Sequence, residues 1–364
     1  MWSFLIFPEN MLQSTGKLYI HFSMISFVKY KKIAFVGGGT GWHVTPIVAL
    51  VHEHAQVKLD YIWIGGHSSL EETEAKKANI KFFPISILKL STVFSPKILL
   101  YPFVLIKWIL QARMILVREN PDIIFSKWWP GSVAVGIACF LLEKKLWIHE
   151  SDTVPGWSNR LLGRIAERIF LWFETARRYF PDLKCTVTGQ IVNPDFLKPP
   201  KEYRYWKTDK QKIFVICGSQ WSRNVFNAIA KTCKHLDVEW IIVLGTLNTD
   251  ARELFADFPH ATIYDWLDSH TIASIAVGAS LVITRGSATT LAELDILHKR
   301  KLIIPLPWSS QNHQYHNALW FKENRWDTVL EDSDMMKKLQ MTITQTLSGD
   351  VIDRTMEREN DFLR

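Results

Sequence analysis

The sequence predicts an α/β protein with two doubly wound parallel sheets in tandem. Short apolar runs alternate with helix-like segments, a pattern typical of parallel strands joined by crossover helices. The pattern begins twice, at Ile33 and again at Ile213, each time with an apolar strand, a glycine-containing turn and a helix. A length of 364 residues and a hydrophobic content of 48% are enough for two domains with separate cores.

The elements of the first half follow from brief apolar runs and longer amphipathic stretches. The expected strands are 33–36, 59–64, 80–84, 122–125 and 146–149, and the expected helices are 46–54, 71–79, 98–119, 133–142 and 159–169. The helix over 98–119 should end at Asn120-Pro121, because proline disfavours helical conformation in the residue before it.

The second half repeats the alternation after a linker marked by Pro194, Pro199 and Pro200 and a charged stretch to Gln211. The expected strands are 213–216, 240–244, 281–284 and 302–305, the expected helices are 224–234 and 289–297, and the polar tail 333–364 is helical in character. Residues 1–23 lack the pattern of a signal peptide, and Met24 directly precedes the first clear strand. We therefore expect a non-native or disordered extension over 1–23, an N-terminal domain over 24–192 and a C-terminal domain over 193–364.

Charge and composition narrow the function. A formal net charge of +7 favours an anionic partner such as a phosphorylated ligand or an acidic membrane surface. Nucleic acid is not expected, because the charge is diffuse and no recognition motif is present. The four cysteines lie far apart without a CxxC pair, so neither a zinc cluster nor a disulfide framework is suggested, and free cysteines fit a reducing compartment. No run reaches 18 apolar residues, so no transmembrane helix is expected.

The first glycine-rich turn, GGGTGWH at 37–43, follows a predicted strand and precedes a helix. Glycine allows positive φ and a close approach of ligand to backbone N–H groups, and a helix start favours phosphate. A tight turn without any ligand is the alternative. His43 has three interpretations: a general base, a phosphate partner or a structural residue.

A second strand, loop and helix start lies at 285–293, RGSATTLAE. Donors at this helix start suit a diphosphate, and an ionised Glu293 accepts hydrogen bonds from sugar hydroxyls. A capped helix with a solvated glutamate is the alternative. His149-Glu150 with Asn159-Arg160, and the run QNHQ at 311–314, either contact a sugar or are polar surface segments. In such sheets ligands bind outside the carboxyl ends of the strands, and the expected site is a cleft between the domains.

In this order the motifs resemble those of the MurG family. They are GGGTGxHVTP, HExxxxPGxxNRLLxRIA, VTGxxV, GSQxSRxxxN, TRGxATTLAEL and PLPxxxxxHQxxNA, and together they cover about 33–330. The resemblance implies a GT-B fold, two Rossmann-like domains facing a cleft. It also implies an inverting transfer of GlcNAc from UDP-GlcNAc to a polyprenyl-diphosphate-linked MurNAc-peptide, lipid I to lipid II, in peptidoglycan synthesis. The enzyme would need no metal and no cofactor and would lie peripherally on the cytoplasmic face of the cell membrane.

The resemblance also assigns residues. The loop facing the acceptor diphosphate would contain Thr40, Gly41, Trp42 and the candidate base His43. UDP would be bound by Ser219, Arg285, Ala288, Thr289, Thr290, Leu291, Ala292 and Glu293, with Glu293 on the ribose and Leu267 beside the uracil. Gln314 would hold the GlcNAc hydroxyls. The cleft would also be lined by His149, Glu150, Asp152, Asn159 and Asn193.

Several residues depart from the family pattern. Asp152 stands where the family has Asn, and Asn193 where it has a phosphate-facing Arg. Tryptophan stands where the family has glycine at Trp42, in Trp128-Trp129 and at Trp221. The chain has 16 Trp and only 17 Gly, whereas about 25 Gly are expected at this length.

These tryptophans lead to a hypothesis about the genetic code. Some bacteria read UGA as glycine and other codes read it as tryptophan, so a gene of the first kind translated by the second code would show Trp for Gly. Trp308 and Trp326 also occupy turns that suit glycine. The alternative is a degenerate, inactive transferase.

The predicted mechanism is a single displacement. The acceptor hydroxyl attacks C1 of GlcNAc opposite UDP, and Arg285 with the helix start after Ser287 stabilises the departing diphosphate. The segment 94–117, with Lys97, Lys107 and Arg113, would face the membrane, and packing of the helix over 98–117 in the core is the alternative. Two alternatives remain: a GT-B enzyme acting on another lipid acceptor, such as diacylglycerol, and a non-catalytic UDP-sugar-binding homologue.

Overall fold

The structure is a computed structural model that describes residue 27 and residues 29–39, 41–54, 58–85, 101–199, 204–218 and 221–348, without the side chains of 41–43, 53 and 101. It divides into two compact units. The first contains the described residues up to Leu197 with Ser287–Ile296 and Trp308–Asn317, and the second contains those of Lys198–Gly286, Leu297–Pro307 and the described part from Ala318 onward.

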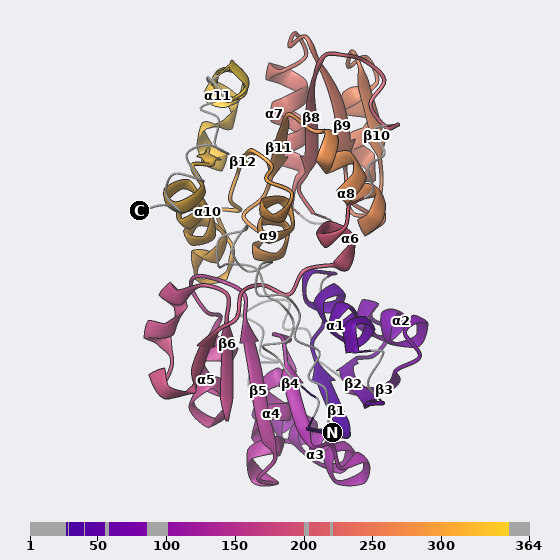
Figure 1. Cartoon of the computed structure of the whole chain (residues 1–364), viewed down its shortest axis with the longest axis vertical. Coiled ribbons are helices and arrows are strands. Elements are labelled where there is room, and N and C mark those ends of the chain that lie inside the picture. The colour runs from indigo at the N-terminus through magenta and orange to yellow at the C-terminus, as the bar shows by residue number, and fades with distance from the viewer. Residues whose placement is uncertain are drawn as a thin grey trace, which may run out of the picture. The chain divides into compact units, whose positions relative to one another are not determined.

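The first unit contains a parallel sheet of seven strands in the order β3-β2-β1-β4-β5-β6-β7 (Figure 1). The strands are β1 (Lys32–Val36), β2 (Asp60–Gly66), β3 (Lys81–Ile85), β4 (Ile123–Ser126), β5 (Lys145–Glu150), β6 (Arg168–Leu171) and β7 (Cys185–Val187). The helices are α1 (Gly41–Glu53), α2 (Leu70–Lys77), α3 (Tyr101–Glu119), α4 (Ser132–Leu141), α5 (Trp157–Ile165) and α6 (Pro194–Leu197). The order reverses between β1 and β4, and ligands of doubly wound sheets bind at this switch point.

The second unit contains a parallel sheet of six strands in the order β10-β9-β8-β11-β12-β13. The strands are β8 (Gln211–Ile216), β9 (Val238–Val243), β10 (Ala261–Tyr264), β11 (Leu281–Thr284), β12 (Lys301–Ile303) and β13 (Thr328–Val329). Its helices are α7 (Arg223–Thr232), α8 (Ser269–Gly278) and α11 (Met335–Ser348). Helix α9 (Ala288–Ile296) groups with the first unit, and α10 (His313–Arg325) crosses the division. The switch point lies between β8 and β11.

Alternate side chains of β1 build two layers of core in the first unit. Ala34 and Val36 pack with α3, α4 and α5, whereas Ile33 and Phe35 pack with α1 and α2. All four are fully buried, so the strand reads as one continuous apolar run rather than an alternating one. This is the layered α/β arrangement that the sequence predicts.

Most of the expected elements are confirmed, with boundaries shifted by a few residues. The expected helix over 159–169 is wrong at its end, because α5 stops at Ile165 and Arg168–Leu171 form β6. An apolar run of four residues directly after a helix has no periodicity of its own that would separate it. The sequence also gave no signal for the short strands β7, β10 and β13 or for α8 and α10. The expected extension 1–23 lies outside the described residues.

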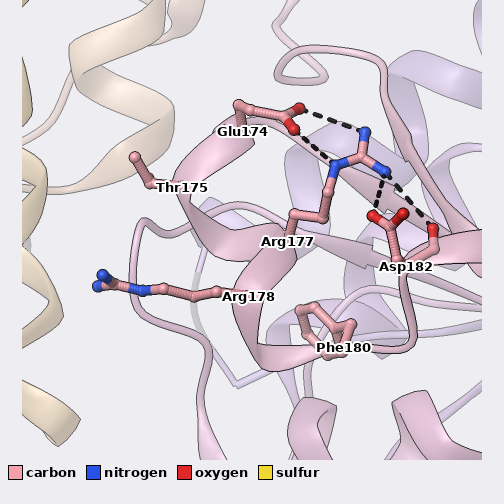
Figure 2. Close-up of a pocket in the computed structure, with 6 residues that line it drawn as sticks. All are labelled: Glu174, Thr175, Arg177, Arg178, Phe180 and Asp182. Carbon is pink, nitrogen blue, oxygen red and sulfur yellow. Dashed lines mark hydrogen bonds and ion pairs between the residues drawn. The ribbon is translucent and has the colours of Figure 1, made fainter.

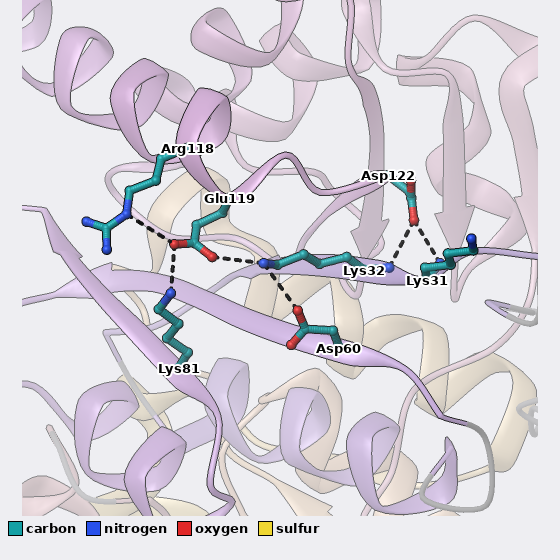
Figure 3. Close-up of polar contacts among 7 residues, drawn as sticks. All are labelled: Lys31, Lys32, Asp60, Lys81, Arg118, Glu119 and Asp122. Atoms are coloured by element: carbon teal, nitrogen blue, oxygen red, sulfur yellow. Dashed lines mark hydrogen bonds and ion pairs between the residues drawn. The ribbon is translucent and has the colours of Figure 1, made fainter.

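Charged side chains join the amino ends of the first strands (Figure 3). Glu119, at the end of α3, accepts hydrogen bonds from Nζ of Lys32 and Nζ of Lys81, both at 2.8 Å. These two bonds lower the pKa of Glu119 to about 2. Asp122 accepts from the backbone N–H groups of Lys31 and Lys32, which lowers its pKa. The charges therefore fasten the edge opposite the carboxyl ends of the strands.

Candidate active site

The carboxyl ends of β1 and β4 meet at the switch point of the first sheet. The backbone N–H of Lys127, directly after β4, donates to the carbonyl of Val36 at 2.8 Å. The buried carboxylate of Glu71 accepts from the N–H groups of Gly39 and Gly66 at 3.2 and 3.0 Å. A Cβ at Gly38 would lie 2.3 Å from Oε1 of Glu71, so a larger residue there would push this carboxylate out of its place. Glu71 therefore holds the glycine loop in shape.

The structure describes only part of the loop that is predicted to face the acceptor substrate. Thr40 lies outside the described residues, and Gly41, Trp42 and His43 begin α1 without described side chains. The helix start thus follows the glycine turn as the sequence predicts. The assignment of His43 as a base stays a prediction.

A buried lysine organises the neighbouring strand ends. Lys127 is 1% exposed. Its Nζ donates to Oγ of Ser151 at 2.7 Å and to Oε1 of Gln190 at 3.0 Å, and lies 3.3 Å from Nδ1 of His149. An ammonium group has three donors, and three acceptors surround this one. Burial lowers the pKa of Lys127 to about 7, although the carboxylates of Asp152, Glu150 and Glu293 oppose the shift.

His149 is a neutral, buried part of the same network. Its Nε2 lies 3.1 Å from the carbonyl of Gly189, which only accepts, so the hydrogen-bond pattern assigns the proton to Nε2. Its Nδ1 is then the acceptor that faces Lys127. Burial and the charge of Lys127 hold the pKa of His149 well below its usual value. His149 therefore acts as a fixed acceptor in this structure.

Glu150 and Asn159 form a second buried pair. Nδ2 of Asn159 donates to Oε2 of Glu150 at 2.9 Å, and the backbone N–H of Asp152 donates to Oε1 of Glu150 at 2.9 Å. Burial, together with the charge of Asp152, raises the pKa of Glu150 to about 7. Oδ1 of Asn159 is buried and has no hydrogen-bond partner among the described residues.

Two contacts bring α9 to this edge, inside the first unit. Nε2 of Gln190 donates to Oγ1 of Thr289 at 3.5 Å. A backbone hydrogen bond from Asn193 reaches Glu293. Burial nevertheless raises the pKa of Glu293 to about 8. The other predicted residues of this helix, Ala288, Thr290, Leu291 and Ala292, are buried as well.

The second unit places Arg285 at its own switch point, after β11. Its Nη1 pairs with Oδ1 of Asp332 at 2.7 Å and its Nη2 donates to the carbonyl of Trp221 at 2.7 Å. Nε of Arg285 is buried and has no partner among the described residues. The positive charge of Arg285, which the predicted diphosphate would need, is therefore already compensated by Asp332. Ser219, in the loop before Trp221, lies outside the described residues.

Some tryptophans replace a glycine of the family pattern or occupy a turn that suits glycine. Three of them have a left-handed backbone conformation. The φ angles are +30° at Trp128, +59° at Trp221 and +61° at Trp326. Such angles are uncommon in bulky L-residues and ordinary in glycine. Trp129 differs, because it is 1% exposed, packs in the core and has no positive φ. Trp308 is half exposed and also has no positive φ.

The remaining predicted residues lie at helix starts or loops. Leu267 is half-buried in the loop before α8, next to the N-cap Asp268. Gln314 is half-buried in the first turn of α10, and its N–H donates to Oγ of Ser309 at 3.3 Å.

A hollow of about 430 Å³ in the first unit contains none of the predicted residues (Figure 2). Arg177 within it is bound on both sides, by Glu174 and Asp182. The charge of Arg177 is therefore already compensated within the hollow.

Sequence reasoning missed Lys127, Ser151, Gln190 and Asn317. Lys127 follows a predicted strand, and Gln190 lies inside the VTGxxV motif. The sequence therefore pointed to these positions, but a lysine or a glutamine in a sequence does not show whether its side chain is buried. Thr153 and Asn317, 164 residues apart, meet only through the fold.

Comparison with known proteins supports the reading of these motifs. Residues 33–171 match the glycosyltransferase family 28 N-terminal domain, and residues 212–362 match its C-terminal domain. The UDP-N-acetylglucosamine--N-acetylmuramyl-(pentapeptide) pyrophosphoryl-undecaprenol N-acetylglucosamine transferase of Clostridium botulinum (strain Kyoto / Type A2) is 32% identical over 325 residues, which cover 85% of this chain and 90% of that protein.

Two solved structures share the fold. The crystal structure of Acinetobacter baumannii MurG has a TM-score of 0.67 at 22% identity and covers 87% of this chain and 91% of its own. UDP-GlcNAc 2-epimerase from Neisseria meningitidis bound to UDP-GlcNAc has a TM-score of 0.56 at 12% identity, covering 87% and 99%. The fold is GT-B, with two Rossmann-like domains. From its two domain matches and its full-length relatives, the chain belongs to glycosyltransferase family 28, in the MurG family of UDP-N-acetylglucosamine transferases.

Proposed function

We propose that this protein transfers GlcNAc from UDP-GlcNAc to a polyprenyl-diphosphate-linked MurNAc-peptide, the conversion of lipid I to lipid II. The observation that carries the proposal is the family membership over both domains, together with the ordered motifs at the strand ends. A likeness to an epimerase fold does not compete with it, because a fold by itself does not specify a reaction.

The reaction is a single displacement with inversion. The acceptor hydroxyl oxygen bonds to C1 of GlcNAc as the bond between C1 and the diphosphate oxygen breaks, and that oxygen keeps the electron pair. The hydroxyl proton passes to a base, for which His43 is the candidate because imidazole titrates near neutral pH. Negative charge grows on the departing UDP, so donors placed around it lower the barrier.

The two substrates are assigned to the two domains expected from the sequence, although α9 and Gln314 group with the first structural unit. We assign acceptor binding to the N-terminal domain over 24–192 and donor binding to the C-terminal domain over 193–364. Arg285 and the start of α9 would face the diphosphate, while Glu293 would accept from the ribose hydroxyls and Gln314 would hold the sugar. Leu267 would flank the uracil. No metal or cofactor enters this scheme.

The membrane contact of the lipid acceptor is assigned to helix α3. None of the described helices is both long and apolar enough to cross a bilayer. Helix α3 exposes an apolar stripe at helical spacing, formed by Phe103, Ile106, Leu110, Met114 and Val117. Exposed cations lie on both sides of the stripe at Lys107, Arg113 and Arg118. An apolar stripe between cations is typical of a helix lying in an anionic membrane surface, here the cytoplasmic face. The expected segment 94–100 lies outside the described residues.

Tryptophans that stand where glycine is expected decide whether the printed chain is active. The left-handed φ angles support glycine as the native residue at positions 128, 221 and 326. We therefore propose that UGA codons of the gene specify glycine there. UGG codons at these positions would contradict this proposal, and the reading as an inactive homologue would then stand.

The decisive experiment is an assay with UDP-GlcNAc and a lipid I analogue. It should use two proteins, the printed chain and a variant with glycine at 42, 128, 129, 221, 308 and 326. We expect the glycine variant to form the disaccharide product with release of UDP. Transfer to diacylglycerol instead of lipid I would support the other lipid acceptor, and binding of UDP-GlcNAc without turnover by both proteins would support a binding protein.

A further inference from the structure

Lys127 is a charged side chain that is buried among hydrogen-bond acceptors, at a position where a core would ordinarily hold an apolar side chain. Its ammonium is 1% exposed and reaches three acceptors from two other segments: His149 and Ser151 from the end of β5, and Gln190 from the loop after β7. A buried charge costs free energy unless it is paired and fully hydrogen-bonded. An apolar side chain would fill the same space without this cost, so the charge serves something other than packing.

The acceptors of Lys127 lead directly to residues assigned to the substrates. Gln190 binds Lys127 through Oε1 and donates from Nε2 to Thr289, in the first turn of α9. The amide orientation of Gln190 is thereby fixed, since Oε1 must accept from Lys127 and from the N–H of Ile191 at 3.0 Å. Loss of the ammonium would remove one of these two donors to Oε1 and would weaken the hold of Gln190 on Thr289.

The second branch leads to the acidic residues. Ser151 accepts from Lys127 at 2.7 Å and lies between Glu150 and Asp152 in the chain. Lys127 also interacts electrostatically with the carboxylates of both residues and with Glu293. The titratable groups that face Lys127 are therefore His149, Glu150, Asp152 and Glu293. A cation here attracts those of the three carboxyl groups that are ionised.

We infer that Lys127 is a positioning residue of the transferase, which through Gln190 and Ser151 fixes the start of α9 and the Glu150–Asp152 segment in their reactive arrangement. This inference rests on the proposed function. Because its side chain is buried, Lys127 is assigned a positioning role instead of a contact with the reacting atoms. It acts because correct placement of binding groups lowers the barrier, and a displacement of about 1 Å can cost about 100-fold in rate.

The test compares Lys127→Met and Lys127→Gln with Lys299→Met. Methionine keeps the length and removes every donor, and glutamine keeps two donors. Lys299 is the matched control, because its half-buried ammonium donates to the carbonyls of Val277 and Ala279 in the second unit. All variants are made in the background that transfers GlcNAc.

We expect Lys127→Met to lower kcat by about 10- to 100-fold with KM for UDP-GlcNAc changed less than about threefold. Lys127→Gln should lie between Lys127→Met and the parent, and Lys299→Met should keep the parent kcat. A kcat within about twofold of the parent for Lys127→Met overturns the inference. If Lys127→Met does not fold, Lys127→Gln decides alone: a lowered kcat at unchanged KM supports the inference, and a parental kcat overturns it.

A second readout does not depend on transfer. Nitrogen-15 NMR of His149 should show a neutral ring with its proton on Nε2 in the parent, and a higher pKa of His149 in Lys127→Met because the neighbouring charge is gone. An unchanged His149 signal would show that Lys127 does not set this network. If the parent transfers no sugar at all, the proposed function fails, while the NMR result still decides whether Lys127 positions its neighbours.

Discussion

The side chains of Asp152 and Asn317 are joined by a hydrogen bond of 2.8 Å, from Nδ2 of Asn317 to Oδ1 of Asp152, across 165 positions of sequence. The orientation of the amide is determined by Thr153, whose N–H and hydroxyl both donate to Oδ1 of Asn317 at 3.0 Å. Asn317 is fully buried. Asp152, which stands where the family has Asn, is thus matched by a donor from the start of α10.

This relationship predicts a reciprocal exchange. Asn317→Asp should destabilise the protein by about 1–3 kcal/mol, because two carboxylates then face each other without the donor between them. Adding Asp152→Asn should restore most of that loss, since the new amide at 152 donates to the new carboxylate at 317 and Thr153 keeps its acceptor. Urea unfolding of the two single variants and the double variant measures the coupling. Additive effects in this cycle would contradict the contact.

The ion pair of Arg285 and Asp332 predicts that Asp332 competes with the ligand's diphosphate for Arg285. Asp332→Asn removes the charge that compensates Arg285, so UDP should bind about 3- to 10-fold more tightly, a gain of about 1 kcal/mol. Calorimetric titration with UDP measures this. The control is Asp250→Asn, which removes an exposed partner of Arg223 and should leave the affinity unchanged. Weaker binding by Asp332→Asn would mean that Asp332 orients Arg285 instead of competing for it.

Trp326 predicts a stabilising substitution to glycine. It is 74% exposed with a φ of +61°, so its side chain gains little from packing while its backbone is strained. The left-handed conformation costs an L-residue about 1–2 kcal/mol, and glycine costs about 0.5–1 kcal/mol in chain entropy. Trp326→Gly should therefore raise the free energy of unfolding by about 0.5–1 kcal/mol. Trp266→Gly, at a similarly exposed site without positive φ, should lower it.

The lowered pKa of Glu119 predicts that the folded protein loses stability in acid. Its pKa of about 2 in the folded protein lies below that of an unfolded glutamate, about 4.3, so its contribution is present above the unfolded value and is lost as the pH falls through the folded value. Glu119→Gln should unfold about 1–2 kcal/mol more easily at pH 7, with a smaller difference near pH 2. Unfolding in urea across this pH range gives the two curves. Glu174→Gln, at an exposed ion pair, should change stability by less than about 0.5 kcal/mol.

The sequence by itself determined the alternation of strands and helices, the two glycine-containing strand ends and the family. These are local features, because an apolar run such as Ile33–Val36 and the turn that follows it are complete within a dozen residues. The sequence also showed tryptophan at positions where glycine is expected. The backbone angles then separated Trp128, Trp221 and Trp326, which have positive φ, from Trp129, which packs in the core.

Only the tertiary structure decided which polar side chains share a network. Lys127, His149 and Gln190 come from three separate strand ends, and a carboxylate such as Glu150 has a pKa near 7 only because the fold buries it beside Asp152. Burial and pairing over long sequence separation depend on the packing of whole layers. No local pattern of residues contains that information, whereas a few neighbouring residues are enough to show the hydrophobic period of a strand or a helix.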